Sequence, residues 1–219
     1  MCKNQNVFRI DRSMHKVKNI VWKLFRGIRL RYKRMFIKSN SSRTIICNNC
    51  LGGVVASDFG LRFCSPFVNL WIPTNHYVEM LNNITSLRSY SIQNITMKNG
   101  TYPVGLLNDK WELHFMHYKS FEEAVSKWKE RVERMDLQNL YVICVETHSA
   151  TYEDMVNFDQ LPLKNKIIIT HKDYPEIESA VTINNYDGLN VNGEILKPSN
   201  RWGKRLYDQV NWIKFLDLR

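Results

Sequence analysis

The residues best suited to chemistry form the run Cys47–Gly53, with the sequence Cys-Asn-Asn-Cys-Leu-Gly-Gly. The β-branched run Thr44–Cys47 predicts a buried strand, and the apolar residues that follow the motif predict a helix. Open α/β sheets place their ligand crevice at such a strand-to-helix turn. Cys50 would lie near the helix N-terminus, where the helix dipole and unpaired N–H groups favour a thiolate and stabilise an oxyanion. The sequence therefore indicates Cys50 as a nucleophile, with four neighbouring candidate substrate-binding residues: Asn48, Asn49, Gly52 and Gly53.

Three other interpretations of this motif remain open. A buried structural cysteine beside a tight turn is more common than a reactive one. Cys47 and Cys50 form a Cys-x-x-Cys pair, but the chain has no second pair at zinc-ligand spacing, so no metal is expected. A redox pair normally opens a helix, whereas Cys47 is predicted to end a strand.

Histidines follow two of the predicted strands and supply candidate bases and binding groups. His117 comes after the strand-like piece Trp111–Met116, before a helix that Ser120 is expected to cap. An imidazole titrates near neutrality, so His117 is a candidate general base for Cys50, with a structural hydrogen-bonded histidine as the alternative. The remaining candidate substrate-binding residues are expected at or just beyond strand ends: Ser65, His171, Lys172 and Asp173.

The hydrophobic pattern predicts the elements that must position these residues. The expected strands are 44–47, 140–145 and 166–170, and the expected helices start near 50, 74, 120 and 152, with a last helix over 202–216. Residues 91–116 favour antiparallel hairpins, because strand-like pieces alternate with Asn-Gly and Asn-Asp turns. We expect an α/β fold: a single domain with a mixed sheet flanked by helices, an antiparallel hairpin insertion and an N-terminal amphipathic helix.

The N-terminal segment differs from the rest of the chain in charge. Residues 1–43 hold thirteen of the 31 Lys and Arg residues and one of the 21 acids, so this segment carries +12 and the remainder −2. We divide the chain into a basic arm, 1–42, and an α/β domain, 43–219, with a linker over 39–42. Apolar residues recur every three or four positions over 15–37, which predicts an amphipathic helix. Such a helix could bind an anionic membrane surface or dock on its own domain.

Composition narrows the expected location and partners. No run of about eighteen apolar residues predicts a transmembrane helix, and the N-terminus lacks the apolar core of a signal peptide. Five cysteines without an export signal indicate reduced thiols in a cytoplasmic protein. The nearly neutral domain argues against nucleic acid as a partner, because such proteins usually carry basic residues across the folded surface. We expect a cytoplasmic protein; if the arm binds a membrane and does not dock on its own domain, the surface that it binds is the inner face of the cell membrane.

Five sequence blocks follow one another along the chain: Cys47–Gly53, Ser65–Leu70, Tyr102–Gly105, His114–Tyr118 and Thr170–Pro175. Together they resemble the DUF1919 family over roughly residues 43–217, with the arm outside the resemblance. Bacterial members of that family are labelled exopolysaccharide or capsule biosynthesis proteins, which implies a polysaccharide precursor or an assembly protein as partner. The family pattern has serine at position 47 and tryptophan at position 51, and this departure weakens a redox role for the Cys-x-x-Cys pair.

The resemblance implies an exopolysaccharide or capsular polysaccharide biosynthesis protein without a tightly bound cofactor. By analogy with papain-like cysteine proteins, Cys50 would be a nucleophile and His117 its base, which suits acyl transfer from acyl-CoA to a sugar hydroxyl. One alternative is a glycosyl or phosphoglycosyl transferase with a nucleotide-sugar donor. Its carboxylates would be Asp58, Asp109 or Asp173, although the chain has no Asp-x-Asp motif. The other alternative is a non-enzymatic adaptor that docks on the membrane and binds an assembly protein.

Overall fold

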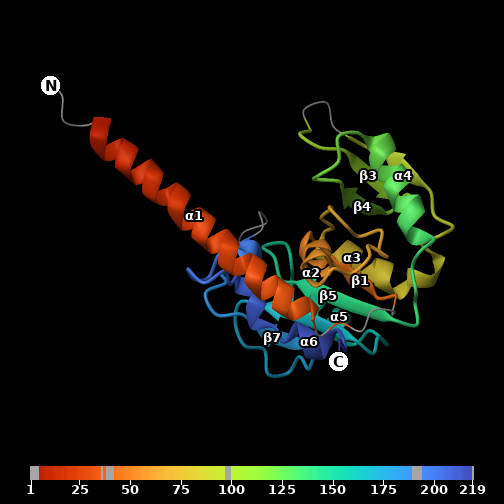
Figure 1. Ribbon diagram of the computed structural model, residues 1–219. Coiled ribbons are helices and arrows are strands. Elements are labelled where there is room, and N and C mark those ends of the chain that lie inside the picture. The colour runs from red at the N-terminus through yellow and green to blue at the C-terminus, as the bar shows by residue number, and fades with distance from the viewer. Residues whose placement is uncertain (1–4, 36, 38–41, 97–99, 189–193, 219) are drawn as a thin grey trace.

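The body of the molecule is built on a parallel sheet. The computed structural model describes residues 5–35, 37, 42–96, 100–188 and 194–218, and in it four parallel strands pair in the order β1-β5-β6-β7 (Figure 1). The strands are β1 Thr44–Cys47, β5 Leu140–Val145, β6 Lys166–Thr170 and β7 Ala180–Thr182. β1 and β5 are buried along their whole length, as parallel strands covered on both faces require.

Two hydrophobic clusters cover the two faces of this sheet. Successive strand residues point to opposite faces, so Ile46 packs on one side and Ile45 on the other. The side of Ile46 is covered by α3 and α5, and the side of Ile45 is covered by α2 and the C-terminal segment that includes α6. These helices are α2 Leu51–Phe59, α3 Thr74–Asn82, α5 Tyr152–Asp159 and α6 Trp212–Phe215. Because both faces of the sheet are covered, polar functional groups are expected at the ends of its strands.

An antiparallel sheet of three strands lies at one end of the molecule (Figure 1). Its strands are β2 Ile92–Asn94, β3 Val104–Leu107 and β4 Trp111–His114. Asn108 and Asp109 join β3 to β4 with φ of 51° and 55°, as the predicted hairpin turn requires. A 3₁₀ turn, Ile84–Ser86, precedes this sheet, and α4, Phe121–Val132, follows it. Ser120 caps α4 as expected, since its side chain accepts from the Glu123 N–H.

The predicted α/β class is confirmed, with the parallel and antiparallel strands divided between two sheets. Two segments differ from the predicted elements. Residues 202–216 form a 3₁₀ turn, Leu206–Gln209, and the short α6, with the extended residue Val210 between them. This break lets Tyr207 and Trp212 both pack into the cluster beside the sheet. Strand β7 was not among the predicted elements, because its three half-buried residues make no distinct apolar run.

The basic arm forms one long helix, α1, over Gln5–Arg34. It begins before the predicted range of 15–37 and ends shortly before the end of that range. Of the expected linker, 39–42, residues 39–41 lie outside the described residues. The N-terminal half of α1 projects away from the body, and the C-terminal half runs along it (Figure 1). None of the helices in the described part of the chain is long and apolar enough to cross a membrane.

Polar contacts hold the C-terminal half of α1 against the body. The Arg26 side chain is buried and donates to Asp58, Asp208 and Tyr207. Lys33 Nζ lies 2.5 Å from Asp208 Oδ1. Both carboxylates belong to the body, so the arm docks on its own domain through basic residues.

Candidate functional site

The turn after β1 is held by two asparagines. Asn48 is buried, and its side chain both donates to Val145 O and accepts from Val145 N at 2.9 Å. Asn49 Oδ1 accepts from the Leu51 N–H at 3.0 Å and so binds a free donor at the start of α2. Both amides therefore serve the strand-to-helix connection, and their role in substrate binding stays a prediction.

Cys50 lies directly before α2, as predicted, and is partly buried. Its Sγ lies 3.8 Å from Leu70 O, to which the thiol donates. Burial raises the pKa of the Cys50 thiol to about 11. Burial also raises the pKa of Cys47 to about 12. The expectation of a lowered pKa at Cys50 is wrong, because desolvation outweighs the backbone hydrogen bonding that favours the thiolate.

The two glycines of the motif allow α2 to pack closely. A Cβ on Gly52 would lie 2.8 Å from the Cβ of Cys47, and a Cβ on Gly53 would lie 3.2 Å from Val68 Cγ1. Gly52 therefore brings the helix against β1, whereas Gly53 also lines the groove described below. Ser65 is buried, and its Oγ accepts from the Phe67 N–H at 3.1 Å, which makes it a turn residue.

The structure does not join His117 to Cys50. His117 is exposed after β4, and no hydrogen bond links its ring to the Cys50 thiol among the described residues. The network at this end of β4 belongs to His114, whose Nε2 lies 3.1 Å from a Glu112 carboxylate oxygen and whose Nδ1 lies 3.5 Å from the Tyr102 hydroxyl. Burial lowers the pKa of His114.

These three side chains line a pocket of about 310 Å³ on the antiparallel sheet. The indole ring of Trp71 lies 4.6 Å from the His114 ring, centroid to centroid. Burial against the Trp71 indole desolvates the His114 imidazole, and the Glu112 carboxylate holds the orientation of the ring. Sequence reasoning missed Glu112, although strand alternation places it on the same face of β4 as His114. Tyr102 was named only within a block that resembles the family, because its contact with His114 depends on how the chain folds.

A second polar cluster lies where β5 and β6 end, and it includes the predicted residue His171. Glu146 is buried and accepts from the His171 N–H at 3.0 Å, the His171 ring at 2.7 Å and the Tyr174 hydroxyl at 2.8 Å. Burial, with the Glu146 hydrogen bond, raises the pKa of Tyr174 to about 12. Glu146 was not among the candidate site residues predicted from the sequence. It directly follows the buried strand β5, and the same kind of position after β6 had made His171 a candidate.

Lys172 and Asp173, the other predicted residues here, are both exposed. The Lys172 ammonium lies 5.1 Å from the centre of the Tyr174 ring. Asp173 Oδ1 accepts from the Thr182 hydroxyl at 2.6 Å, which ties the loop after β6 to β7. These contacts stabilise the loop, and a ligand role for either side chain stays a prediction.

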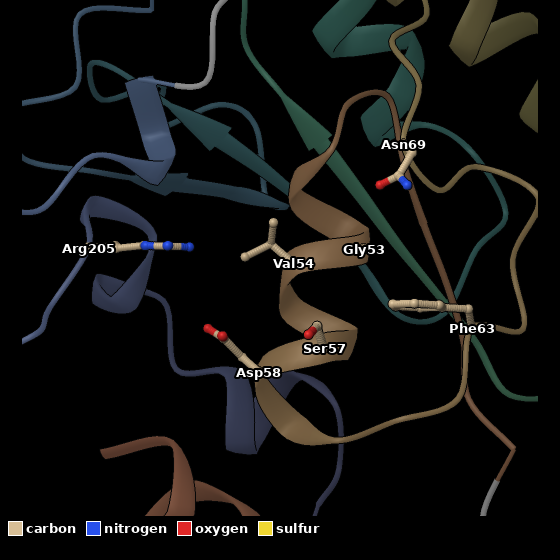
Figure 2. Close-up of a pocket in the computed structure, with 7 residues that line it drawn as sticks. All are labelled: Gly53, Val54, Ser57, Asp58, Phe63, Asn69 and Arg205. Atoms are coloured by element: carbon tan, nitrogen blue, oxygen red, sulfur yellow. The ribbon is translucent and has the colours of Figure 1, made fainter. Parts of the chain in front are cut away.

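A groove of about 370 Å³ crosses the outward face of α2. Its polar lining comes from Ser57 and Asp58 on α2, Asn69 on the following segment and Arg205 near the C-terminus. In Figure 2, Arg205 points toward α2 from one side, and Phe63 and Asn69 lie on the other. This groove gathers residues far apart in the sequence, and of the predicted site residues Gly53 lines it.

Comparison with known proteins places the chain in a family. The sequence pattern of the family described as "Domain of unknown function (DUF1919)" matches residues 20–217. A Haemophilus influenzae protein described as "Uncharacterized protein" is 38% identical over 179 residues, which cover 82% of this chain and 86% of that protein. The match begins at residue 20, so the expectation that the whole arm lies outside the family pattern is wrong. The chain belongs to the DUF1919 family.

Proposed function

We propose that this chain is a peripheral membrane protein of exopolysaccharide or capsule biosynthesis, held on an anionic bilayer by α1. The observation that carries the membrane part is the orientation of α1. The helix docks on the body through basic and aromatic side chains, and an exposed apolar stripe faces outward. The polysaccharide part is supported by the sequence blocks that resemble the DUF1919 family.

The outward side of α1 carries a continuous apolar stripe. Leu24 is 63% exposed, Ile20 is 66% exposed and Ile28 is 56% exposed. Val17 and Met35 extend the stripe at helical spacing and are exposed as well. Burying such a stripe in a less polar medium is favourable by about 25 cal/mol per Å² of apolar surface, and the body of this chain does not cover it.

The charges around the stripe favour an anionic lipid surface as its partner. Lys18 and Lys23 are exposed and, at 100° per residue, lie on opposite flanks of the stripe. Arg31 is exposed close to its centre line. An apolar strip edged by lysines is typical of helices that lie in a bilayer interface. Two copies of the helix facing each other would bring their basic residues together, which disfavours a dimer through this side.

The test is sedimentation of the full chain with vesicles of phosphatidylglycerol and, separately, of phosphatidylcholine. We expect binding to the anionic vesicles, with about 1 kcal/mol from each basic residue near the surface. The double variant Leu24→Glu, Ile28→Glu should lose binding because it places two carboxylates in the stripe. Leu137→Glu is the matched control, since Leu137 is an exposed apolar residue of the body.

Equal sedimentation of the stripe variant and the control would overturn the membrane proposal. So would a dimer, measured by light scattering, that the stripe variant dissociates. Point variants are preferable to deletion of the arm, because deletion would leave Asp58 and Asp208 without Arg26. In cells, loss of surface polysaccharide on gene deletion should be reversed by the wild-type chain and not by the stripe variant.

Acyl transfer is a second candidate. It is favoured because Cys50 is partly exposed, whereas the other cysteines that the structure describes are buried: Cys47, Cys64 and Cys144. The Cys50 thiolate would attack an acyl-CoA thioester, release the CoA thiolate and then pass the acyl group to a sugar hydroxyl, which regenerates the thiol. Mass spectrometry after incubation with acetyl-CoA tests this step. An acetyl adduct on the wild type that is absent from Cys50→Ser supports it, and an adduct retained in Cys50→Ser contradicts it.

A further inference from the structure

The groove over α2 contains a guanidinium that the protein does not neutralise. Arg205 is partly buried, and its Nε is buried without a hydrogen-bond partner among the described residues. No carboxylate of those residues forms an ion pair with the Arg205 side chain; its backbone N–H alone bonds to Asp208. Trp22 of α1 lies beneath the guanidinium, with Arg205 Cζ 5.6 Å from the indole centroid. The cation is therefore held in place by stacking and presents its N–H groups to the groove.

Two acids close to Arg205 are already occupied: Asp58, which lines the same groove, and Asp208, which accepts from the Arg205 backbone N–H. Asp58 accepts from Arg26 and from the Tyr207 hydroxyl. Asp208 pairs with Arg26 and also with Lys33 at 2.5 Å. Neither carboxylate is left to balance Arg205, so the groove carries a positive end. A half-buried cation without a partner is unusual in a folded chain, because it loses hydration without gaining a counter-charge.

The opposite side of the groove offers a different chemistry. Ser57 is an exposed hydroxyl on α2, and Asn69 is exposed with φ of 64°, a conformation that is uncommon outside glycine. Phe63 adds an aromatic ring that is 36% exposed and is held by Arg131, whose Cζ lies 6.0 Å from the ring centroid. A hydroxyl and an amide beside an aromatic ring match the alternating polar and apolar surfaces of a sugar.

We propose that this groove binds a sugar phosphate. The phosphate lies on Arg205, whose planar fork suits two phosphate oxygens. The sugar lies against Phe63 and exchanges hydrogen bonds with Ser57 and Asn69. The volume of about 370 Å³ is at the small end of ligand pockets and suits one sugar unit. This inference deepens the proposed function by naming its substrate class, and it rests on that function for the choice of a sugar.

Calorimetric titration of the full chain with glucose 1-phosphate tests the site. We expect binding by the wild type, about tenfold or more weakening in Arg205→Gln, and partial recovery in Arg205→Lys. Arg201→Gln is the matched control, because Arg201 is an exposed neighbour that stacks on Trp202 outside the groove. Circular dichroism of each variant shows whether the fold is intact.

Titrations with other ligands test the phosphate contact and the sugar contact separately. Glucose alone should bind more weakly than glucose 1-phosphate, and inorganic phosphate that binds as tightly as the sugar phosphate would overturn the sugar contact. A polyprenyl phosphosugar in micelles distinguishes a lipid-linked source from a free one, since both carry the phosphate that Arg205 recognises. No binding of glucose 1-phosphate, or equal binding to a folded Arg205→Gln, would overturn the site.

The same preparations are tested for vesicle sedimentation, so the two proposals fail separately. Arg205→Gln should still sediment with anionic vesicles, because Arg205 is not part of the apolar stripe. The stripe variant should still bind glucose 1-phosphate, because Leu24 and Ile28 lie on the outward side of α1.

Discussion

Arg26 of α1 forms a buried ion pair with Asp58 of α2, and this pair joins the N-terminal helix to the parallel sheet behind it. Arg26→Met should lower the free energy of unfolding by about 3–5 kcal/mol, because it leaves Asp58 buried without its cation. Urea denaturation measures the loss. The double variant Arg26→Met, Asp58→Leu should lose less than the sum of the two single variants. Additive losses would mean that the pair contributes no coupling.

Gly203 and Gly27 give a matched pair of substitutions at the junction between α1 and the body. Gly203 has φ of 76°, and a Cβ there would lie 2.4 Å from the Arg26 backbone nitrogen. Gly203→Ala should therefore lower stability by more than about 1 kcal/mol. Gly27→Ala should raise it by about 0.5–1 kcal/mol, since its Cβ would meet nothing within 4 Å and alanine favours the helix. Urea midpoints that shift in the same direction for both would contradict the docked position of α1.

The His114 network predicts a specific loss of stability in acid. Burial places the pKa of the folded His114 below its ordinary value of 6.5, so the unfolded chain binds the proton first as the pH falls. Stability should therefore decline below pH 6.5 until the folded pKa is passed, and His114→Gln should remove this part of the decline. Thermal unfolding of both proteins across this range measures the difference. His117→Gln, an exposed histidine outside the network, is the control, and a decline unchanged in His114→Gln would refute the prediction.

Cys50 should alkylate slowly at neutral pH and faster as the pH approaches its pKa of about 11. The thiolate is the reactive form, so a raised pKa suppresses the rate. It should still react before the buried Cys144, whose pKa burial raises well above the ordinary value. Peptide mapping after iodoacetamide treatment at several pH values measures both rates. Rapid labelling of Cys50 at pH 7 would show that its surroundings favour the thiolate after all.

Local patterns in the sequence predicted much of the scaffold. The runs Thr44–Cys47, Leu140–Val145 and Lys166–Thr170 are buried strands because their β-branched and apolar residues suit a sheet covered on both faces. The Asn108–Asp109 turn formed a hairpin because both residues tolerate positive φ. Each of these signals lies within a few residues, where the chemistry of one segment decides its conformation.

The sequence predicted the candidate site only in part. The positions of Cys50 and His171 after strands were predicted and observed. Their surroundings were not, because the pKa of Cys50 depends on burial by other segments and the partner of His171 is Glu146, which follows the neighbouring strand β5. Arg205 and Asn69 carried no local signal, since they come to line the same groove, on opposite sides of α2, only after the chain has folded.

The sequence by itself determined the α/β class, most of the strands and the amphipathic, basic character of α1, because periodicity and charge are properties of a segment alone. Tertiary structure decided which side of α1 the body would cover. Asp58 and Asp208, supplied by segments distant in the chain, draw in Arg26 and Lys33 and leave the apolar stripe outward. The same folding brings Arg205 into the groove over α2 without an ion-pair partner among the described residues, because Asp58 and Asp208 have paired with α1.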